Sequence, residues 1–104
     1  MEKIVEQGLL YDFYGALLTE HQKSVYELLV YENMSLSEIA SEQGISRQGV
    51  HDIIKRCDKT LKDYEDKLHL IEKFISIKED VEKIEKIAGE EEVTKLAHKI
   101  LESL

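Results

Sequence analysis

The residues between positions 46 and 59 offer the side chains best suited to chemistry in this sequence. Arg47 and Gln48 stand side by side, and these two types can form paired hydrogen bonds with base edges, Arg with guanine and Gln with adenine. Lysine and arginine side chains further along can hold phosphates. The candidate nucleic-acid-binding residues are Ser46, Arg47, Gln48, His51, Lys55, Arg56 and Lys59. The pattern therefore predicts a surface that contacts a nucleic acid.

The stretch from residue 36 to residue 55 is expected to position these side chains as two short helices joined by a tight turn. Its inner positions are small or apolar: Ile39, Ala40, Ile45, Val50 and Ile53. Gly44 can adopt the positive φ that ends a helix in a sharp bend. Ser46 can then cap the second helix, because its hydroxyl accepts a backbone N–H of the first turn. This frame predicts a helix-turn-helix with the candidate residues on the outer face of its second helix.

A less specific interpretation fits the same residues. Amphipathic helical hairpins with Ala and Gly at the crossing occur in many all-α domains that never bind DNA, and helix-turn-helix units also serve as protein-binding modules. Five positions agree in one frame, however, and this agreement is more specific than a single Gly between helices. We therefore favour the helix-turn-helix.

The composition predicts an all-α protein. The chain has 104 residues, no proline and five glycines, and it is rich in Leu, Ile, Glu and Lys without runs of period two. We expect a helix-turn-helix bundle over residues 1–62 and a helical C-terminal extension over residues 63–104, the expected dimerisation region. A chain of this length can bury a modest core.

The net charge of −8 argues against a DNA-binding protein at first sight, because phosphate contacts supply most nonspecific affinity. The distribution weakens that objection. Residues 46–62 contain five basic and two acidic side chains, whereas the segments on either side are acidic. This positive segment is the proposed recognition helix and its continuation. On charge alone, a short basic run is better explained as a solvated helix face.

Helices are expected over residues 5–18 and 20–31, from residue 36 to the turn at Gly44, and from residue 46 to about residue 75. Thr19 with Gln22, and Ser35 with Glu38, have the spacing of a capping box. Gly15 indicates either close contact with a neighbour or a glycine that the helix merely tolerates. The expected core residues are Phe13, Leu17, Leu28, Leu29, Ile39, Ile45, Val50 and Ile53. Tyr11, Tyr14, Tyr26 and Tyr31 are interpreted as core or boundary residues and not as a stacking platform for bases.

Beyond the motif, apolar residues alternate at spacings of three and four, which is a heptad pattern. They are Ile54, Cys57, Leu61, Tyr64, Leu68, Ile71 and Ile75. One helix over residues 46–75 would be roughly 45 Å long, too long for a small domain to cover. Ser76 and Glu79 predict a helix restart at Ile77, and a last helix follows Glu90. These helices can form a three-helix antiparallel arrangement within one chain or between two, and we expect a homodimer.

The other reactive side chains form no catalytic or metal-binding pattern. The histidines are scattered without Cys or carboxylate at zinc-ligand spacing. Cys57 lies on the apolar seam and is expected to be a small buried hydrophobe. Adjacent acids such as Glu65 and Asp66 point in different directions on a helix, so we expect them on solvated faces. We therefore expect no enzyme, no metal and no cofactor.

A cytoplasmic location is expected. The single cysteine cannot form an internal disulfide, which favours a reducing compartment. The first residues lack a basic start followed by a long apolar segment, and no apolar run approaches the length of a membrane span.

Four stretches of the sequence, taken together, match a known family pattern: Leu17–Thr19, Gln22, Glu32–Ala40 and Gly44–Val50. In these residues the chain resembles the YlxM family of small bacterial helix-turn-helix proteins, and the resemblance covers the chain to about residue 74. The same residues are similar, more loosely, to region four of sigma factors, a helix-turn-helix that reads promoter DNA. The resemblance implies a cytosolic bacterial protein encoded beside the signal recognition particle GTPase or its receptor and acting in that pathway. Asp52 departs from a strong promoter reader, because its carboxylate would repel phosphate.

Two hypotheses follow. In the first, the protein is a DNA-binding regulator, and a dimer on a palindrome would hold its recognition helices about 34 Å apart. In the second, the same positive helix binds signal recognition particle RNA or an acidic patch of the GTPase. On residues alone DNA binding leads, and on the resemblance the secretion link leads.

Overall fold

The computed structural model describes residues 1–104 and is built from helices alone, so the all-α prediction is confirmed. The elements are α1 (Lys3–Tyr14), the 3-10 turn η1 (Gly15–Leu17), α2 (Glu20–Val30), α3 (Leu36–Gln43), α4 (Arg47–Leu68), α5 (Leu70–Ile87) and α6 (Glu91–Ser103). They form two compact units, Met1–Leu68 and His69–Leu104. The boundary expected at residue 62 falls inside α4, which continues to Leu68.

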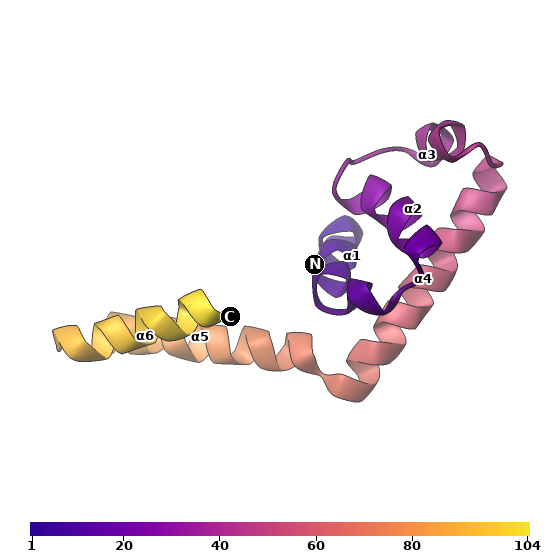
Figure 1. Ribbon diagram of the computed structural model, residues 1–104. Coiled ribbons are helices and arrows are strands. Elements are labelled where there is room, and N and C mark those ends of the chain that lie inside the picture. The colour runs from indigo at the N-terminus through magenta and orange to yellow at the C-terminus, as the bar shows by residue number, and fades with distance from the viewer. The chain divides into compact units, whose positions relative to one another are not determined.

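The first unit is organised around α4, which contacts α1, α2 and α3 (Figure 1). The core side chains come from all four helices and the 3-10 turn region. They are Leu10, Tyr11, Tyr14, Leu18, Val25, Tyr26, Ile39, Ala40, Val50, Ile54, Cys57 and Leu61. Removing one large apolar side chain from water contributes about 1.5–3 kcal/mol. Burial against three neighbours therefore fixes which face of α4 points inward.

The expected core was correct in part. Ile39 and Val50 are fully buried, which confirms them as core residues. The prediction for Leu17 was wrong: it is 58% exposed, and Leu18 is buried in its place. The reason is local, because α1 ends at Tyr14 and a 3-10 turn, with three residues per turn, shifts the inward position. Other expected core residues are only half-buried: Phe13, Leu28, Leu29, Ile45 and Ile53.

Polar contacts tie α4 to the first two helices. The half-buried Asp58 carboxylate accepts a hydrogen bond from the Tyr26 hydroxyl at 2.5 Å and others from the Gln7 amide at 3.0 and 3.1 Å. The Tyr14 hydroxyl donates to Glu65. Glu65 is half-buried, so its assignment to a solvated face was wrong. The side chain is held at the protein by Tyr14, which lies 51 positions earlier in the sequence.

Three of the tyrosines belong to the core, as expected. Tyr11, Tyr14 and Tyr26 are at most 9% exposed, and the rings of Tyr11 and Tyr26 stack 5.6 Å apart. Tyr31 is 55% exposed and lies edge-on to Tyr11, which makes it a boundary residue. Gly15 lies against the Tyr11 ring, since a Cβ at Gly15 would come within 2.7 Å of ring carbons. The expected close contact at Gly15 is confirmed.

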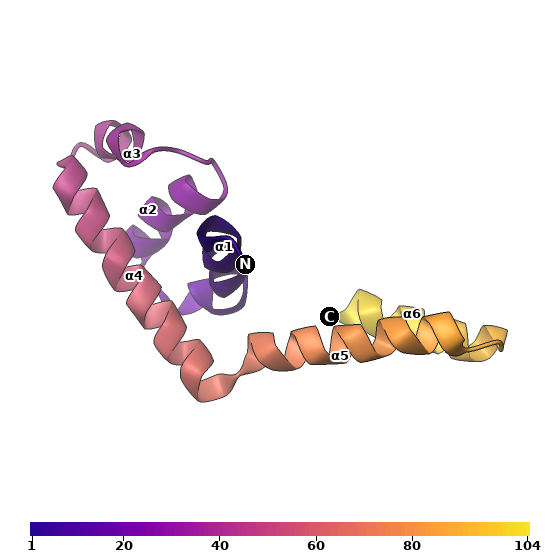
Figure 2. The same ribbon diagram turned by 180° about the vertical axis from the view of Figure 1, so that it is seen from behind.

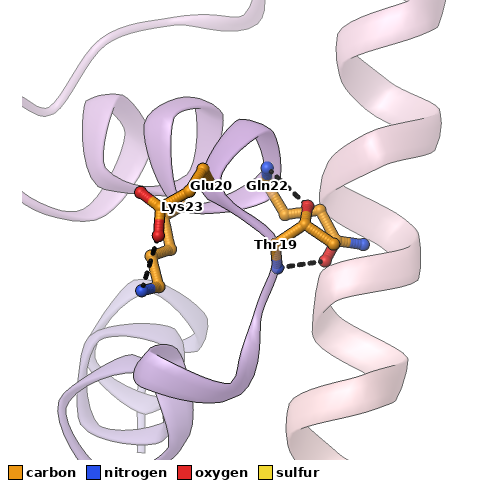
Figure 3. A network of polar contacts seen from close by, with 4 residues as sticks. All are labelled: Thr19, Glu20, Gln22 and Lys23. Atoms are coloured by element: carbon orange, nitrogen blue, oxygen red, sulfur yellow. Dashed lines mark hydrogen bonds and ion pairs between the residues drawn. The ribbon is translucent and has the colours of Figure 1, made fainter.

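The caps at the starts of α2 and α3 match the sequence prediction. Figure 3 shows Thr19 and Gln22 joined in both directions: the Gln22 N–H donates to Thr19 Oγ1, and the Thr19 N–H donates to Gln22 Oε1. Ser35 and Glu38 form the same pair of bonds at the start of α3. The Ser35 N–H lowers the pKa of Glu38, because it stabilises the carboxylate. Each box satisfies two backbone groups that the helix itself leaves unbonded.

The second unit is a helical hairpin in which α6 returns along α5 (Figure 2). Its buried side chains are Ile71, Val81 and Ala97. The last helix begins at Glu91, close to its expected start.

The prediction of one helix to residue 75 and a restart at Ile77 was wrong, because the interruption lies at His69. His69 takes a left-handed backbone with φ 55°, and its carbonyl then accepts the Lys73 N–H at 3.0 Å as α5 begins. Ser76 and Glu79 lie inside α5. The side chain of Val81 is buried on α5, so packing favours a helix that continues through this segment. Within the second unit α5 and α6 form a two-helix hairpin, and the three-helix antiparallel arrangement, within one chain or between two, stays a prediction.

Candidate nucleic-acid interface

The turn between α3 and α4 sets the direction in which α4 leaves. Gly44 has φ 67°, and its N–H donates to the Ala40 carbonyl. The Ile45 N–H donates to the same carbonyl at 3.1 Å. No atom lies within 4 Å of a Cβ built on Gly44, so the left-handed backbone, not crowding, favours glycine here. The turn at Gly44 is therefore confirmed.

Ser46 caps α4 as the sequence predicted. Its Oγ accepts the Gly49 N–H at 2.9 Å, and its carbonyl accepts the Val50 N–H at 3.1 Å. The helix consequently starts at Arg47, and the two residues that could reach base edges lie in its first turn. An uncapped first turn frays more easily, so this bond helps to keep Arg47 and Gln48 in helical positions.

The inner side of α4 differs slightly from the prediction. Val50 is fully buried, and Ile54 is 7% exposed, whereas Ile53 is only half-buried. The buried isoleucine of this turn is therefore Ile54 and not the expected Ile53. Ala40 on α3 is 8% exposed and remains the small residue close to the turn.

Every candidate residue lies on the exposed side of the unit. Ser46, Arg47, Gln48, His51, Lys55, Arg56 and Lys59 are all exposed. Successive residues of an α-helix are about 100° apart, so positions 48, 52, 55 and 59 form one stripe along α4. Arg47 is turned away from that stripe and lies at the start of the helix. The structure thus places Gln48, Lys55 and Lys59 in the stripe, His51 and Arg56 on either side of it, and Ser46 and Arg47 at the start of the helix.

Asp52 interrupts this stripe. Its Oδ1 accepts a hydrogen bond from Gln48 Nε2 at 3.0 Å and lies 3.5 Å from His51 Nδ1. The amide that could donate to adenine is therefore already bonded within the helix. Asp52 also lines a shallow hollow together with Lys55, Arg56 and Lys59. A phosphate entering this hollow would meet three cations and one carboxylate.

Lys59 has a partner, Asp63, that was not predicted from the sequence. Lys59 Nζ donates to Asp63 Oδ2 at 3.1 Å, one turn further along α4. The spacing of four residues between a lysine and an aspartate on one helix was the available signal. An exposed pair of this kind contributes little to stability and is screened by salt. Lys59 therefore remains able to turn toward a phosphate.

Cys57 lies on the opposite, inner side of α4. Its side chain is fully buried, and burial together with the nearby Asp58 charge raises the pKa of the thiol to about 11. The thiol is therefore protonated near neutral pH and acts as a small apolar group, as expected.

The structure also bears on metal sites and membrane spans. No group of three or more His, Cys, Asp or Glu side chains is placed to hold a metal ion. None of the helices combines the length and the apolar character that crossing a membrane requires.

Comparison with known proteins identifies the chain's relatives. Residues 1–101 match the model of a family described as "Putative helix-turn-helix protein, YlxM / p13 like". The chain is 44% identical over 100 residues to "UPF0122 protein YlxM" of Bacillus subtilis (strain 168), covering 92% of this chain and 91% of that protein. It is 41% identical over 104 residues to a "UPF0122 protein" of Bacillus pumilus (strain SAFR-032), covering 100% and 94%.

A clostridial relative matches a shorter part of the chain. A "UPF0122 protein" of Clostridium botulinum (strain Alaska E43 / Type E3) is 52% identical over 73 residues, covering 70% of this chain and 67% of that protein. The family match extends over both units of the structure. The chain therefore belongs to the YlxM / p13-like family of helix-turn-helix proteins.

Proposed function

We propose that this protein is a DNA-binding regulator that uses the first turns of α4 as its recognition surface. The observation that carries the proposal is the joint placement of Gly44, Ser46 and Arg47: a left-handed turn, a side-chain cap and an exposed arginine at the first helical position. In helix-turn-helix proteins this is the end of the recognition helix that meets base edges. Family membership supports the proposal, because the family is described as a helix-turn-helix protein.

The charges predict how such binding behaves. Lys55, Arg56 and Lys59 are exposed and would hold phosphates. Asp52 opposes them, and the rest of the chain is acidic. Because each phosphate contact releases counterions, the affinity should fall steeply with salt. We therefore expect binding that is weak on random DNA and is strengthened when Arg47 and Gln48 meet their preferred bases.

The experiment measures anisotropy of a labelled duplex from the protein's own promoter region and of a random duplex, each at two salt concentrations. Arg47→Ala should reduce the preference for the specific duplex about 10- to 100-fold, the range for losing one good base contact. Lys55→Ala should weaken both duplexes alike and reduce the salt slope by about one. Lys86→Ala on α5 removes the same charge elsewhere and serves as the matched control.

Two results would overturn the proposal. One is binding by Arg47→Ala that equals the unaltered protein on both duplexes. The other is an affinity that does not change with salt, since phosphate contacts must respond to it.

A second candidate is binding to signal recognition particle RNA or to an acidic patch of its GTPase through the same stripe. The bond between Gln48 and Asp52 favours it, because an occupied amide and a central carboxylate suit base reading poorly, while a small basic face suits a partner that needs few phosphates. Titration against that RNA and copurification with the GTPase separate the two candidates. No copurification and no effect on GTP turnover would exclude the GTPase.

Both candidates make the protein a binding module and not an enzyme. Both also require it in the cytoplasm, where nucleic acid is accessible and the free Cys57 thiol stays reduced.

A further inference from the structure

The α5–α6 hairpin carries a row of apolar side chains that its own helices leave exposed. Val81 and Ala97 are 5% and 3% exposed. Beside them, large aliphatic side chains stay open to water: Ile77 at 44%, Ile84 at 41%, Leu96 at 61% and Ile100 at 45%. We call these four residues the apolar rim.

The apolar rim lies along one edge of the hairpin. On α5, Ile77 and Ile84 are seven residues apart, so they lie almost in line. On α6, Leu96 and Ile100 are four residues apart and likewise share a side. Around the axis of α5, Ile77 and Ile84 are both rotated in the same direction from Val81. Around the axis of α6, Leu96 and Ile100 are rotated in that same sense from Ala97. Because the two helices are antiparallel, rotations of the same sense place all four side chains on one edge of the hairpin. The four side chains therefore form one continuous strip.

The opposite edge of the hairpin is polar. His98 Nδ1 on α6 lies 3.5 Å from Glu85 Oε1 on α5, and His98 Nε2 lies 3.1 Å from Glu102 Oε1. This contact bridges the two helices on the side away from the apolar rim. One edge is thus closed by polar side chains, and the other is left without cover from the hairpin.

A hairpin of this size needs more apolar burial than it has. The unit spans His69–Leu104, and only Ile71, Val81 and Ala97 are buried in it. Units below about 40 residues rarely bury enough surface to be stable without a disulfide, a metal or association with another chain. The hairpin contains no cysteine. Association through the apolar rim would supply the missing burial.

We propose that a second copy of this chain covers the apolar rim, with the two α5 helices antiparallel about a two-fold axis beside Ile77. A two-fold interface must be self-complementary, because each copy contributes the same surface. The charges beside the rim meet this requirement. Lys73 and Asp80 are seven residues apart on α5 and both are exposed. About an axis between residues 76 and 77, Lys73 of each copy lies opposite Asp80 of the other.

The proposal does not depend on DNA binding, so its test can fail separately from that of the proposed function. If both hold, the dimer supplies two recognition helices and roughly doubles the phosphate contacts of one complex. If only the dimer holds, the hairpin is an assembly element for another role of α4.

The first experiment is analytical ultracentrifugation of the full chain from about 1 to 100 µM. The unaltered protein should be dimeric at the upper end, and Ile77→Asp should weaken the dimer at least about 100-fold, because it buries a charge at the centre of the interface. Glu79→Asp, on the opposite side of α5, should leave the dimer intact. A protein that stays monomeric at 100 µM overturns the proposal, as does a dimer that Ile77→Asp does not weaken.

The second experiment tests the register without disturbing the apolar rim. Lys73→Glu and Asp80→Lys should each weaken the dimer several-fold, since each places like charges opposite one another, and the double variant should restore it. Ile77→Cys should form an interchain disulfide on mild oxidation, whereas Glu79→Cys should not. Additive effects of the two charge changes, or equal crosslinking at both positions, would overturn the antiparallel arrangement.

Discussion

Gln48 and Asp52 are joined across one turn of α4, with Gln48 Nε2 donating to Asp52 Oδ1 at 3.0 Å. The bond lies at the N-terminal end of the exposed stripe, where it joins the residue that could read adenine to a carboxylate beside the cations that could hold phosphates. It makes Asp52 an internal competitor for the recognition surface in two ways, by occupying an amide and by opposing phosphate charge.

Replacing Asp52 should therefore increase the affinity for DNA. Asp52→Asn removes the charge, and we expect about 3- to 10-fold tighter binding to any duplex at low salt. Asp52→Ala also frees Gln48, so its gain should be larger on a duplex that contains the preferred adenine. Anisotropy titrations with specific and random duplexes measure both effects. Glu32→Gln removes an equal charge away from the stripe, and an equal gain from that control would contradict the argument.

Gly15 should not tolerate a larger side chain. A Cβ at this position meets ring carbons of Tyr11 at 2.7 Å, and Tyr11 stacks on Tyr26. Gly15→Ala must push the Tyr11 ring out of its place, at a cost of about 1–3 kcal/mol. Urea unfolding followed by circular dichroism measures the change. Gly8→Ala, where no atom lies within 4 Å of the new Cβ, is the control and should be neutral or stabilising in its helix.

Much of this fold could be predicted from the sequence where a structure depends on residues close together along the chain. The caps at Thr19, Ser35 and Ser46 each join atoms three residues apart, and the bend at Gly44 needs only a residue that accepts positive φ. Such features repeat whatever the rest of the protein does. The exposed face of α4 could be predicted in the same way, because the position at which a helix begins determines which of its later residues share a side.

The errors had two sources, a local change of helix type and a contact between distant segments. Leu17 was assigned to the core because it lies four residues after Phe13, a spacing that holds only if α1 continues past Tyr14. Glu65 was assigned to solvent because its partner Tyr14 is far away in the sequence. At the candidate site, the exposure of the side chains was predictable, but the hydrogen bond that engages the Gln48 amide was not. The spacing of Gln48 and Asp52 permits a bond, yet only the side-chain conformations show that it forms.

Alkaline pH should destabilise the protein through its buried tyrosines. Burial, followed by the hydrogen bond to Asp58, raises the pKa of Tyr26 well above its ordinary 10.0, and burial raises the pKa of Tyr11 to about 12. Folding therefore favours the neutral phenols. The contribution of these two phenols to the free energy of unfolding should be constant below about pH 9, then fall as the pH rises from 10 toward 12, where the unfolded chain loses its phenolic protons first.

Tyr26→Phe tests the source of this dependence. At neutral pH it should cost about 1–2 kcal/mol, since Asp58 keeps only its bonds from Gln7. Between pH 10 and 12 its stability should fall less steeply than that of the unaltered protein. Urea unfolding at a series of pH values measures both quantities. An unchanged slope for Tyr26→Phe would show that Tyr26 does not contribute.

The left-handed residue at His69 gives a test of where the long helix is interrupted. His69 has φ 55°, a conformation that costs a residue with a side chain about 1–2 kcal/mol and costs glycine almost nothing. Its contact with Glu72 at 3.2 Å is exposed, and an exposed pair of this kind adds little. If the backbone keeps this turn, His69→Gly should be more stable than His69→Ala by about 1 kcal/mol.

A continuous helix through residue 69 would reverse that order, because alanine in a helix interior is more stable than glycine by about 1 kcal/mol. The two possibilities therefore predict opposite orders of stability for the glycine and alanine variants, not merely different magnitudes. Chemical unfolding of the two variants, with the same pair of substitutions at the exposed helical position Lys78 as a control, gives the answer. Alanine should be the more stable at Lys78, and glycine the more stable at His69.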